Sequence, residues 1–530
     1  MALTKTAKTS VVVFNCTLLS RVLGFIRILV QASTLGFFRL NDSYSFSNEI
    51  PNMMYELILG SLISSTLLPF FVKQYKSKKT EDDKSIFSFM FYSSGAIALL
   101  AVALAPVLAV VMTFLNQDSN AGEQRTLVIF FLYFFLPQIF FYAMTSTMQT
   151  YLAARHRFVA SALAPVFNNL VVIAILLFIK NGLNNSDPAQ RLDQIKILLG
   201  VGTTLGVVAI AGFLTIAYKR AGGSFSLGSI KNSVVKDMLH QSKWMAAYAM
   251  TNQIALFLIF ALANKDESGI SIYLAAWAYF QLPHGLIAMN ITTIAMPKFS
   301  HDIEYEGKSI KADTVLEIPE KTKNLLRQTS TALITIIGIT SALGIAISRP
   351  LMQLILVHGK VTPEQGLLSA NVLTGFLIFA SAFSFYIFVV RLSNVIGKTK
   401  EIFKINIIQN VVNIILALIF VQFSPIIGLS LAYSLSYFLV MPFAFRLVKT
   451  NFKTSPINFK PVLYILGSAV IGAYFGLRIS TQFDSNIMGI LISGALCTAC
   501  IAIGSLIAKD EITALIKVFF DPKTAGSTNK

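Results

Sequence analysis

The chain has 530 residues, of which 55% are hydrophobic and 13% are charged, with a formal net charge of +18. Charged residues make up about a quarter of an ordinary soluble domain, so this composition excludes a soluble globular protein. Apolar runs of about 20 residues, each long enough to cross the hydrocarbon of a bilayer, recur along the whole chain. The sequence therefore predicts an all-α, polytopic membrane protein.

The first apolar segment resembles a secretory signal peptide, because lysines precede an apolar run. Arg21 interrupts that run, however, and no small-x-small cleavage site follows it. We therefore expect a retained first span.

About fourteen spans are expected along the chain. Their approximate extents are 10–37, 45–74, 86–115, 126–153, 158–180, 196–218, 239–264, 270–298, 326–348, 366–396, 402–423, 426–447, 459–480 and 486–508.

Most of the 43 lysines and arginines fall at one set of helix ends. These basic segments are 73–79, 155–157, 219–220, 298–325, 398–400 and the tail from Lys509. Positive loops stay in the cytoplasm, so both termini are predicted to be cytoplasmic. The basic charge is explained by topology and contact with anionic lipids, and nucleic-acid binding is not expected.

A weak internal repeat indicates two related halves. "LAARHRFVASALAPVFNN" and "SNVIGKTKEIFKINIIQN" both place a basic turn about a dozen residues before an asparagine. An offset of roughly 230 to 240 residues suggests two pseudo-symmetric six-helix lobes, a plan familiar in transporters. We expect lobes at 1–220 and 221–450, followed by two additional spans and a short cytoplasmic tail over 451–530.

Ionisable residues inside a membrane are costly and point to function. The clearest are Arg21 and Arg27 in the first span, Glu49 and Glu56 in the second, and Arg391 in the tenth. At 100° per residue, one polar stripe of the second span collects Ser45, Glu49, Asn52, Glu56 and Gly60. Such a stripe lines a water-filled cavity or a buried network with the first helix.

Two explanations of these charges remain open. The arginines could pair with Glu49 or Glu56 and lock two helices together. Buried ion pairs stabilise poorly compared with apolar packing, so a cavity that accepts an anion is the preferred reason for the arginines. Arg391 lies near a helix end, where it could instead extend its charge to the interface.

Other candidate sites are weaker. His284 stands between Pro283 and Gly285, where a broken helix could expose backbone groups to a substrate, or where a kink could simply hold a hydrogen-bonded histidine. Catalytic triads, Walker sequences, dinucleotide loops and metal-ligand clusters are not found, so neither an enzyme nor a cofactor or metal site is expected. Cys497 and Cys500 form a C-x-x-C in the last span, which we interpret as apolar packing.

Five segments together resemble the MurJ (MviN) lipid II flippases of the MOP exporter superfamily. They are "SRVLGFIR", "EIPNMMYELILGSLISSTLLPFFV", "LAARHRFVASALAPVFNN", "LGVGTTLGVV" and "FQLPHGLIAMNITTIAMPKFS". The resemblance implies two lobes around a central cavity, a groove by the last two helices for a lipid tail, and Arg21 and Arg27 as contacts of the substrate diphosphate. The implied substrate is lipid II, the undecaprenyl-diphosphate-linked disaccharide-pentapeptide of peptidoglycan synthesis.

The chain departs from common members of that family at four positions. Ile28 replaces an aspartate that often follows the second arginine, Tyr55 and Glu56 replace an arginine pair, and Ala278 stands where many relatives have an arginine. The "PNxxYELxLG" form resembles the actinobacterial branch.

The resemblance implies a flippase of the bacterial cytoplasmic membrane that works by alternating access. Arg21 and Arg27 would hold the diphosphate, and Ser45, Asn52 and Glu56 would line the path of the sugar and peptide. The alternatives are an exporter of another polyprenyl-linked glycan, a cation-coupled antiporter of the same superfamily, and a non-transporting scaffold that binds cell-wall synthesis or division proteins.

Overall fold

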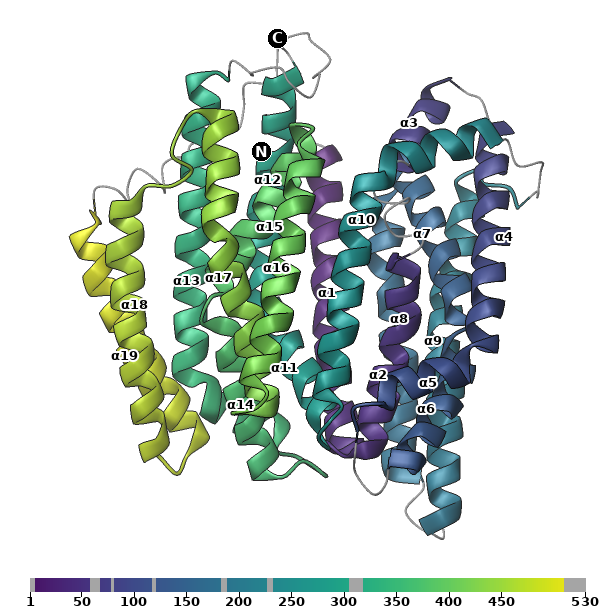
Figure 1. The fold of residues 1–530 in the computed structure, drawn as a ribbon, viewed down its shortest axis with the longest axis horizontal. Helices are drawn as coiled ribbons and strands as arrows, with labels where there is room; N and C mark the ends of the chain where they lie inside the picture. Colours follow the sequence, from purple (N-terminus) through teal and green to yellow (C-terminus); the bar gives the residue numbers. More distant parts are fainter. Residues whose placement is uncertain are drawn as a thin grey trace. The chain divides into compact units, whose positions relative to one another are not determined.

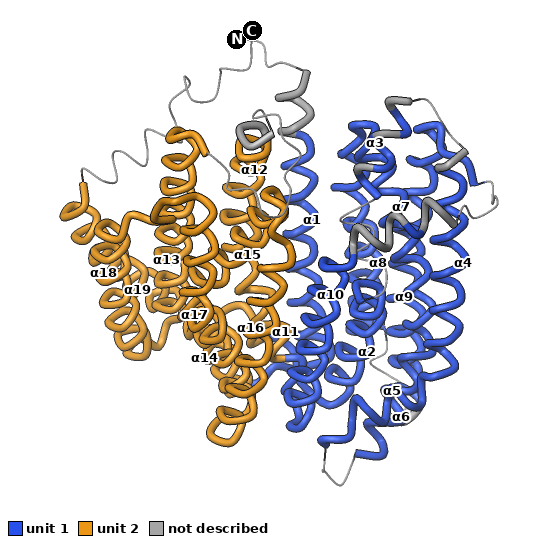
Figure 2. The backbone as a smooth tube through the Cα atoms, turned by 45° about the horizontal axis from the view of Figure 1, so that its top comes forward, with its two compact units in different colours: residues 1–271, 358–362 blue, residues 272–357, 363–530 orange. Residues whose placement is uncertain are grey.

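The computed structural model describes residues 5–57, 67–77, 81–116, 121–182, 188–225, 232–304 and 318–509, and these residues form helices joined by short turns (Figure 1). The predicted all-α class is confirmed. The backbone divides into two compact units, residues 1–271 with 358–362 and residues 272–357 with 363–530 (Figure 2).

Unit 1 holds the first ten helices and the start of the eleventh. They are α1 (Lys5–Leu35), α2 (Arg39–Tyr55), α3 (Leu68–Ser77), α4 (Glu81–Ala103), α5 (Ala105–Thr113), α6 (Ala121–Phe135), α7 (Gln138–Ala154), α8 (Phe158–Gly182), α9 (Pro188–Arg220), α10 (Asn232–Ala263) and α11 (Gly269–Pro283).

Unit 2 holds the remainder of α11 and the elements after it. They are η3 (His284–Ala288), α12 (Met289–Glu304), α13 (Glu320–Leu356), α14 (Pro363–Leu377), α15 (Ala380–Val395), α16 (Thr399–Phe420), α17 (Pro425–Phe452), α18 (Phe459–Ile479), η4 (Ser480–Gln482) and α19 (Asn486–Ile507).

Within the described ranges, eleven helices are long and apolar enough to cross a membrane, and a twelfth span results if α14 and α15, bent by 50°, count as one. The chain is therefore a multi-pass membrane protein. Two of the fourteen expected spans are not among these twelve. The second, 45–74, runs through residues 58–66, including Gly60, which lie outside the described residues; the eighth, 270–298, is interrupted by the π-helical turn η3.

The two turns of the proposed repeat have the same backbone geometry. His156 and Gly397 both have a left-handed φ, of 57° and 70°. Each turn also contains the long hydrogen bond of a Schellman motif. The backbone N–H of Arg157 donates to Leu152 O at 2.9 Å, and that of Lys398 donates to Ser393 O at 2.7 Å. The same turn also ends α9, where Gly222 has a φ of 85° and the backbone N–H of Gly223 donates to Tyr218 O at 3.0 Å. The repeat and its lobe boundaries at 220 and 450 therefore stay a prediction.

Glycines let α18 approach its neighbours closely in unit 2. A Cβ at Gly472 would lie 3.0 Å from the backbone of Cys497 on α19, and one at Gly476 would lie 2.6 Å from Ala346 Cβ on α13. Small residues four apart are a common device for packing membrane helices. Cys497 is completely buried in this contact, in agreement with a packing role.

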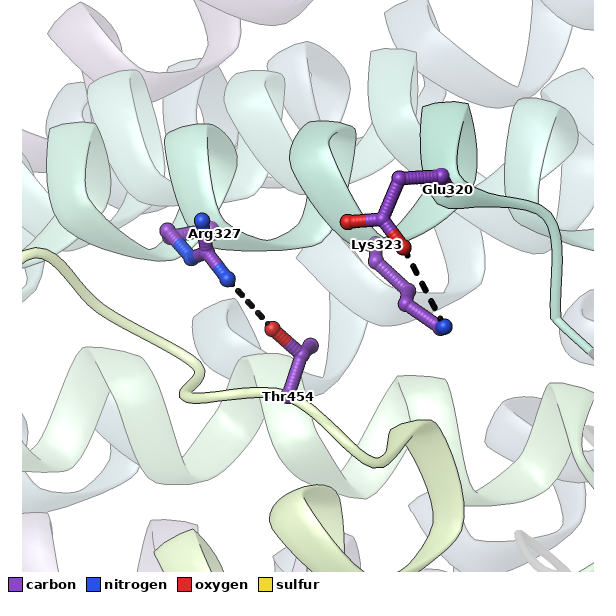
Figure 3. Close-up of polar contacts among 4 residues, drawn as sticks. All are labelled: Glu320, Lys323, Arg327 and Thr454. Carbon is purple, nitrogen blue, oxygen red and sulfur yellow. Dashed lines mark hydrogen bonds and ion pairs between the residues drawn. The ribbon is translucent and has the colours of Figure 1, made fainter.

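Polar contacts fix the chain between α17 and α18 against the first turns of α13 (Figure 3). An Arg327 Nη donates to Thr454 Oγ1 at 2.5 Å, and the backbone N–H of Asn458 donates to Thr331 Oγ1 at 2.9 Å. These contacts set where α18 begins and hence how it lies along α13.

A buried carboxylate ahead of the second expected span binds the first turn of α11. Asp42 accepts hydrogen bonds from the backbone N–H groups of Ser268 at 2.7 Å and Ser271 at 2.9 Å, and from Ser271 Oγ at 2.6 Å. Its side chain is fully buried. Asp42 thus satisfies N–H groups that an uncapped helix would leave without partners.

Two alanine substitutions in α18 separate close packing from helix propensity. Gly476→Ala should lower the melting temperature, because its Cβ would overlap Ala346. Gly467→Ala, the matched control, has no neighbour within 4 Å and should be neutral or stabilising by up to about 1 kcal/mol through helix propensity. Thermal unfolding in detergent measures both, and equal shifts would contradict the packing.

Asp42 gives a pH dependence of known sign. Burial outweighs the hydrogen bonds from Ser271 and Ser268 and raises the pKa of Asp42 from 3.8 to about 6. The stability from protonated Asp42 is therefore present below about pH 4 and lost as the pH rises through about 6.

Asp42→Asn removes this titration, although it also loses acceptors. As the pH rises from 4 to 8, the parent should lose the stability that comes from protonated Asp42, and the variant should not. The melting temperature of the variant should therefore rise relative to that of the parent. A difference that does not change with pH would contradict this assignment.

Candidate substrate site

Arg27 lies in the C-terminal half of α1 and has no carboxylate partner among the described residues. Its side chain is partly buried, and its Nε is buried without a hydrogen bond. Its charge is close enough to act on Glu49 and on the hydroxyls of Tyr44 and Tyr142. A guanidinium so placed retains all of its hydrogen-bond donors for another group.

The helix-locking ion pair is not seen in the described part of the chain. The ion pairs found there within 4.0 Å join other residues, and none includes Arg21, Arg27, Glu49 or Glu56. Glu49, on α2, and Glu56, at its C-cap, are partly buried. Of the two, Glu49 is close enough to Arg27 for their charges to interact, but it does not occupy the donors of Arg27.

The polar stripe of α2 divides into a packed end and an open end. Ser45 is buried, donates to Asn41 Oδ1 at 3.1 Å and accepts from Gln31 Nε2 at 3.0 Å. Gln31 also donates to Asn41 at 2.8 Å, so this triad ties α1 to α2. Asn52, two turns further on, is exposed.

A hydrogen-bonded layer on α7 and α9 supports this region, and the sequence analysis did not identify it. Tyr44 and Thr203 hydroxyls lie 2.8 Å apart, Gln138 Nε2 donates to Thr204 Oγ1 at 2.9 Å, and Tyr142 donates to Gln138 at 3.4 Å. The signal in the sequence that could have identified this layer is the occurrence of isolated polar residues within apolar spans. The layer fixes the two tyrosines that face the charge of Arg27.

The middle of α1 is hydrogen-bonded to α8. Asn169 Nδ2 donates to Ser20 O at 3.2 Å, and a Cβ on Gly24 would lie 3.5 Å from the same nitrogen. The small residues Ser20 and Gly24 thus let α8 approach α1 closely on either side of Arg21. Arg21 itself is partly buried and has no hydrogen-bond or ion-pair partner within the described ranges.

His284 and Arg391 lie in unit 2, and each is associated with the same face of α15. His284 Nδ1 shares a hydrogen bond with Ser384 Oγ at 2.9 Å, and an Arg391 Nη contacts Met289 Sδ at 3.3 Å. Ser384 and Arg391 are seven residues apart, which is two helical turns on the same face. His284 opens the π turn η3 and is buried with its ring against Phe383, which fits the kinked helix with a hydrogen-bonded histidine.

An apolar groove of about 580 Å³ opens on unit 2. It runs between α13 and α18 and reaches α17 and the bend between α14 and α15. Side chains such as Phe379, Phe438, Leu466 and Tyr474 line it, and polar lining is limited to Ser341, Thr374 and Ser381. Its shape and chemistry suit an extended hydrocarbon chain.

Comparison with known proteins adds sequence and fold relationships to this geometry. The family model described as "Lipid II flippase MurJ" matches residues 31–497. A "Probable lipid II flippase MurJ" from Rickettsia prowazekii is 22% identical over 440 residues, covering 81% of each chain. A protein of the same description from Vibrio cholerae is 24% identical over 478 residues, covering 83% of this chain and 82% of the relative.

Solved structures share the fold at low sequence identity. "Lipid II flippase MurJ, inward closed conformation" superposes with a TM-score of 0.77 at 19% identity, over 95% of this chain and all of the other. An inward-facing multidrug resistance MATE transporter of the MOP superfamily gives a TM-score of 0.66 at 13% identity, over 84% and 98%.

The family match spans most of the chain, and the same helical fold recurs in a MurJ structure. The resemblance read from the sequence motifs is thereby confirmed at the level of the family, although the actinobacterial-like branch stays a prediction. The chain belongs to the MurJ lipid II flippase family of multi-pass membrane transporters.

Proposed function

We propose that this protein moves lipid II from the cytoplasmic to the outer leaflet of the bacterial cytoplasmic membrane by alternating access. The observation that carries the proposal is Arg27, a partly buried guanidinium without a carboxylate partner in the described ranges. A diphosphate is the matching group, because guanidinium binds phosphate oxygens bidentately.

Each part of the proposed substrate has a counterpart among the described side chains. Arg21 and Arg27 would hold the diphosphate, and exposed Asn52 with Glu49 and Glu56 would line the path of the sugar and peptide. The undecaprenyl tail would lie in the groove between α13 and α18. Ser45 would act by positioning α2, since its hydroxyl is engaged with Gln31 and Asn41.

His284 and Arg391 would take part from unit 2. Arg391 makes only a weak contact to a sulfur in the described structure, so it can supply a further charge to the head group. His284 would set the shape of the π turn. Membrane lipids and cell-wall synthesis or division proteins are the other partners that we propose.

A cation-coupled antiporter is the second candidate function. Glu49 and Glu56 lack ion-pair partners among the described residues, and paired acids suit a proton or cation relay. Arg27 favours the flippase, because its charge acts at the same place and would repel a cationic substrate. Transport of lipid II against transport of a cationic dye distinguishes the two.

Arg27→Ala tests the flippase proposal. Losing one charge-assisted contact of about 1.5–3 kcal/mol should slow lipid II translocation roughly 10- to 100-fold, while the protein still inserts and folds. Arg27→Lys should be intermediate, because it keeps the charge and loses the two-pronged geometry.

The measurement is lipid II accessibility at the outer leaflet after depletion of the parental protein. Lys265→Ala is the control, since Lys265 is an exposed cation between α10 and α11 and its loss should leave translocation unchanged. A well-expressed Arg27→Ala protein that flips lipid II at the parental rate would rule out the proposed role.

The proposed orientation, with both termini in the cytoplasm, has its own test. In a chain whose Cys16, Cys497 and Cys500 are replaced by serine, a cysteine at position 184 should react with an impermeant reagent from outside, because its loop carries few basic residues. A cysteine at position 77 should react only after the membrane is opened. The reverse pattern would invert the orientation.

A further inference from the structure

Three cationic side chains gather around the last turn of α1 in unit 1. Lys180 Nζ, from the end of α8, donates to Ser33 Oγ at 3.4 Å. The backbone N–H of Lys360 donates to Ser33 O at 3.1 Å. Arg191, in the first turn of α9, is close enough to Lys360 for the two charges to repel each other. Contacts with Ser33 thus bring Lys180 and Lys360 together at the end of α1, and Arg191 lies near Lys360.

The segment that carries Lys360 is held tightly against α1. Gly359 has a left-handed φ of 65°, and a Cβ at this position would lie 2.1 Å from Ser33 O. Only glycine permits so close an approach in this conformation. The backbone therefore holds Lys360 beside Ser33, although its side chain is exposed.

None of the three cations is neutralised within the ranges that the structure describes. They form no ion pair, and Arg191 Nε is buried without a hydrogen bond. The nearby acid Asp193 is already paired with Lys196 at 2.6 Å. Partial burial, and then the charge of Arg191, lower the pKa of Lys360, so the positive charge of Arg191 acts at Lys360.

Helix dipoles explain only one member of the cluster. Lys180 lies in the last turn of α8, where a cation is favourable. Arg191 lies in the first turn of α9, which has no acidic residue and where the dipole opposes a cation. The dipole of α9 therefore does not stabilise Arg191, and Lys360 lies in the turn between α13 and α14, outside any helix.

We propose that Lys180, Arg191 and Lys360 form a binding site for a phosphate-bearing group at the outer end of α1. The guanidinium and the two ammonium groups provide charge-assisted donors, and Ser33 Oγ adds a hydroxyl. The phosphate can come from the head group of an anionic lipid or from the diphosphate of a lipid-linked substrate. The site does not include Arg27, so it stands or falls independently of the flippase proposal.

Site-resolved acetylation of the full-length protein tests this site. In nanodiscs of phosphatidylcholine at pH 8, an amine-reactive acetyl donor should modify Lys360 faster than exposed Lys265, because a lowered pKa leaves more of its amine neutral. Inorganic diphosphate should then slow acetylation of Lys180 and Lys360 several-fold and leave Lys265 unchanged, as read by mass spectrometry. Sodium chloride at equal ionic strength controls for screening.

A second arm identifies the source of the phosphate. Nanodiscs that contain phosphatidylglycerol, without diphosphate, should protect the same two lysines if a lipid head group occupies the site. Protection by diphosphate alone would assign the site to a diphosphate-bearing substrate. Both results support a phosphate site, whereas protection by neither would overturn it.

Arg191→Gln and Lys265→Gln form the matched pair of variants, since each removes one positive charge near a helix end of unit 1. Loss of the Arg191 guanidinium should weaken protection by diphosphate about tenfold in apparent affinity. Lys265→Gln, which lies between α10 and α11, should leave it unchanged. If diphosphate protects the lysines equally well in both variants, the site is refuted. If it protects Lys265 of the parent as well as it protects Lys180 and Lys360, the effect is nonspecific screening and the site is again refuted.

Discussion

The functional region depends on one constraint: the guanidinium of Arg27 is held inside an apolar helical protein and has no carboxylate partner among the described residues. Moving a charge away from water is costly, and the cost is usually met by an ion pair or by protein hydrogen bonds. Arg27 has neither among the described residues, although Glu49 lies close enough to feel its charge. The arrangement is stable only because the rest of the fold holds it, and it gains most from an anionic ligand.

The supporting structure is polar and rigid. The triad of Gln31, Asn41 and Ser45 fixes α1 against α2, and Tyr44 is fixed in turn by Thr203. A site whose donors are positioned before the substrate arrives loses less conformational entropy on binding. These five side chains therefore fix the helices around Arg27 through hydrogen bonds with one another.

The sequence predicts the helical class well because span length and hydropathy are local properties. It also indicates Arg27 as an exceptional charge and Pro283–Gly285 as a helix interruption, which the structure contains as the π turn at His284. The groove could not be predicted in this way, since its walls come from helices as far apart in sequence as α13 and α18. The position of Lys360 beside Ser33 is likewise a tertiary contact of segments more than 300 residues apart.

The placement of Arg21, Arg27 and Ser33 along α1 links the two proposed anion sites. Successive members are six residues apart, so each step is about 9 Å along the helix axis. Transport requires sites that bind strongly enough to admit the substrate and weakly enough to release it. Arg27 offers an enclosed guanidinium, whereas Lys180 and Lys360 are exposed to solvent, where charge interactions are weaker. A phosphate that left Arg27 for the cluster at Ser33 would thus move from a site of tight binding to one of easy release.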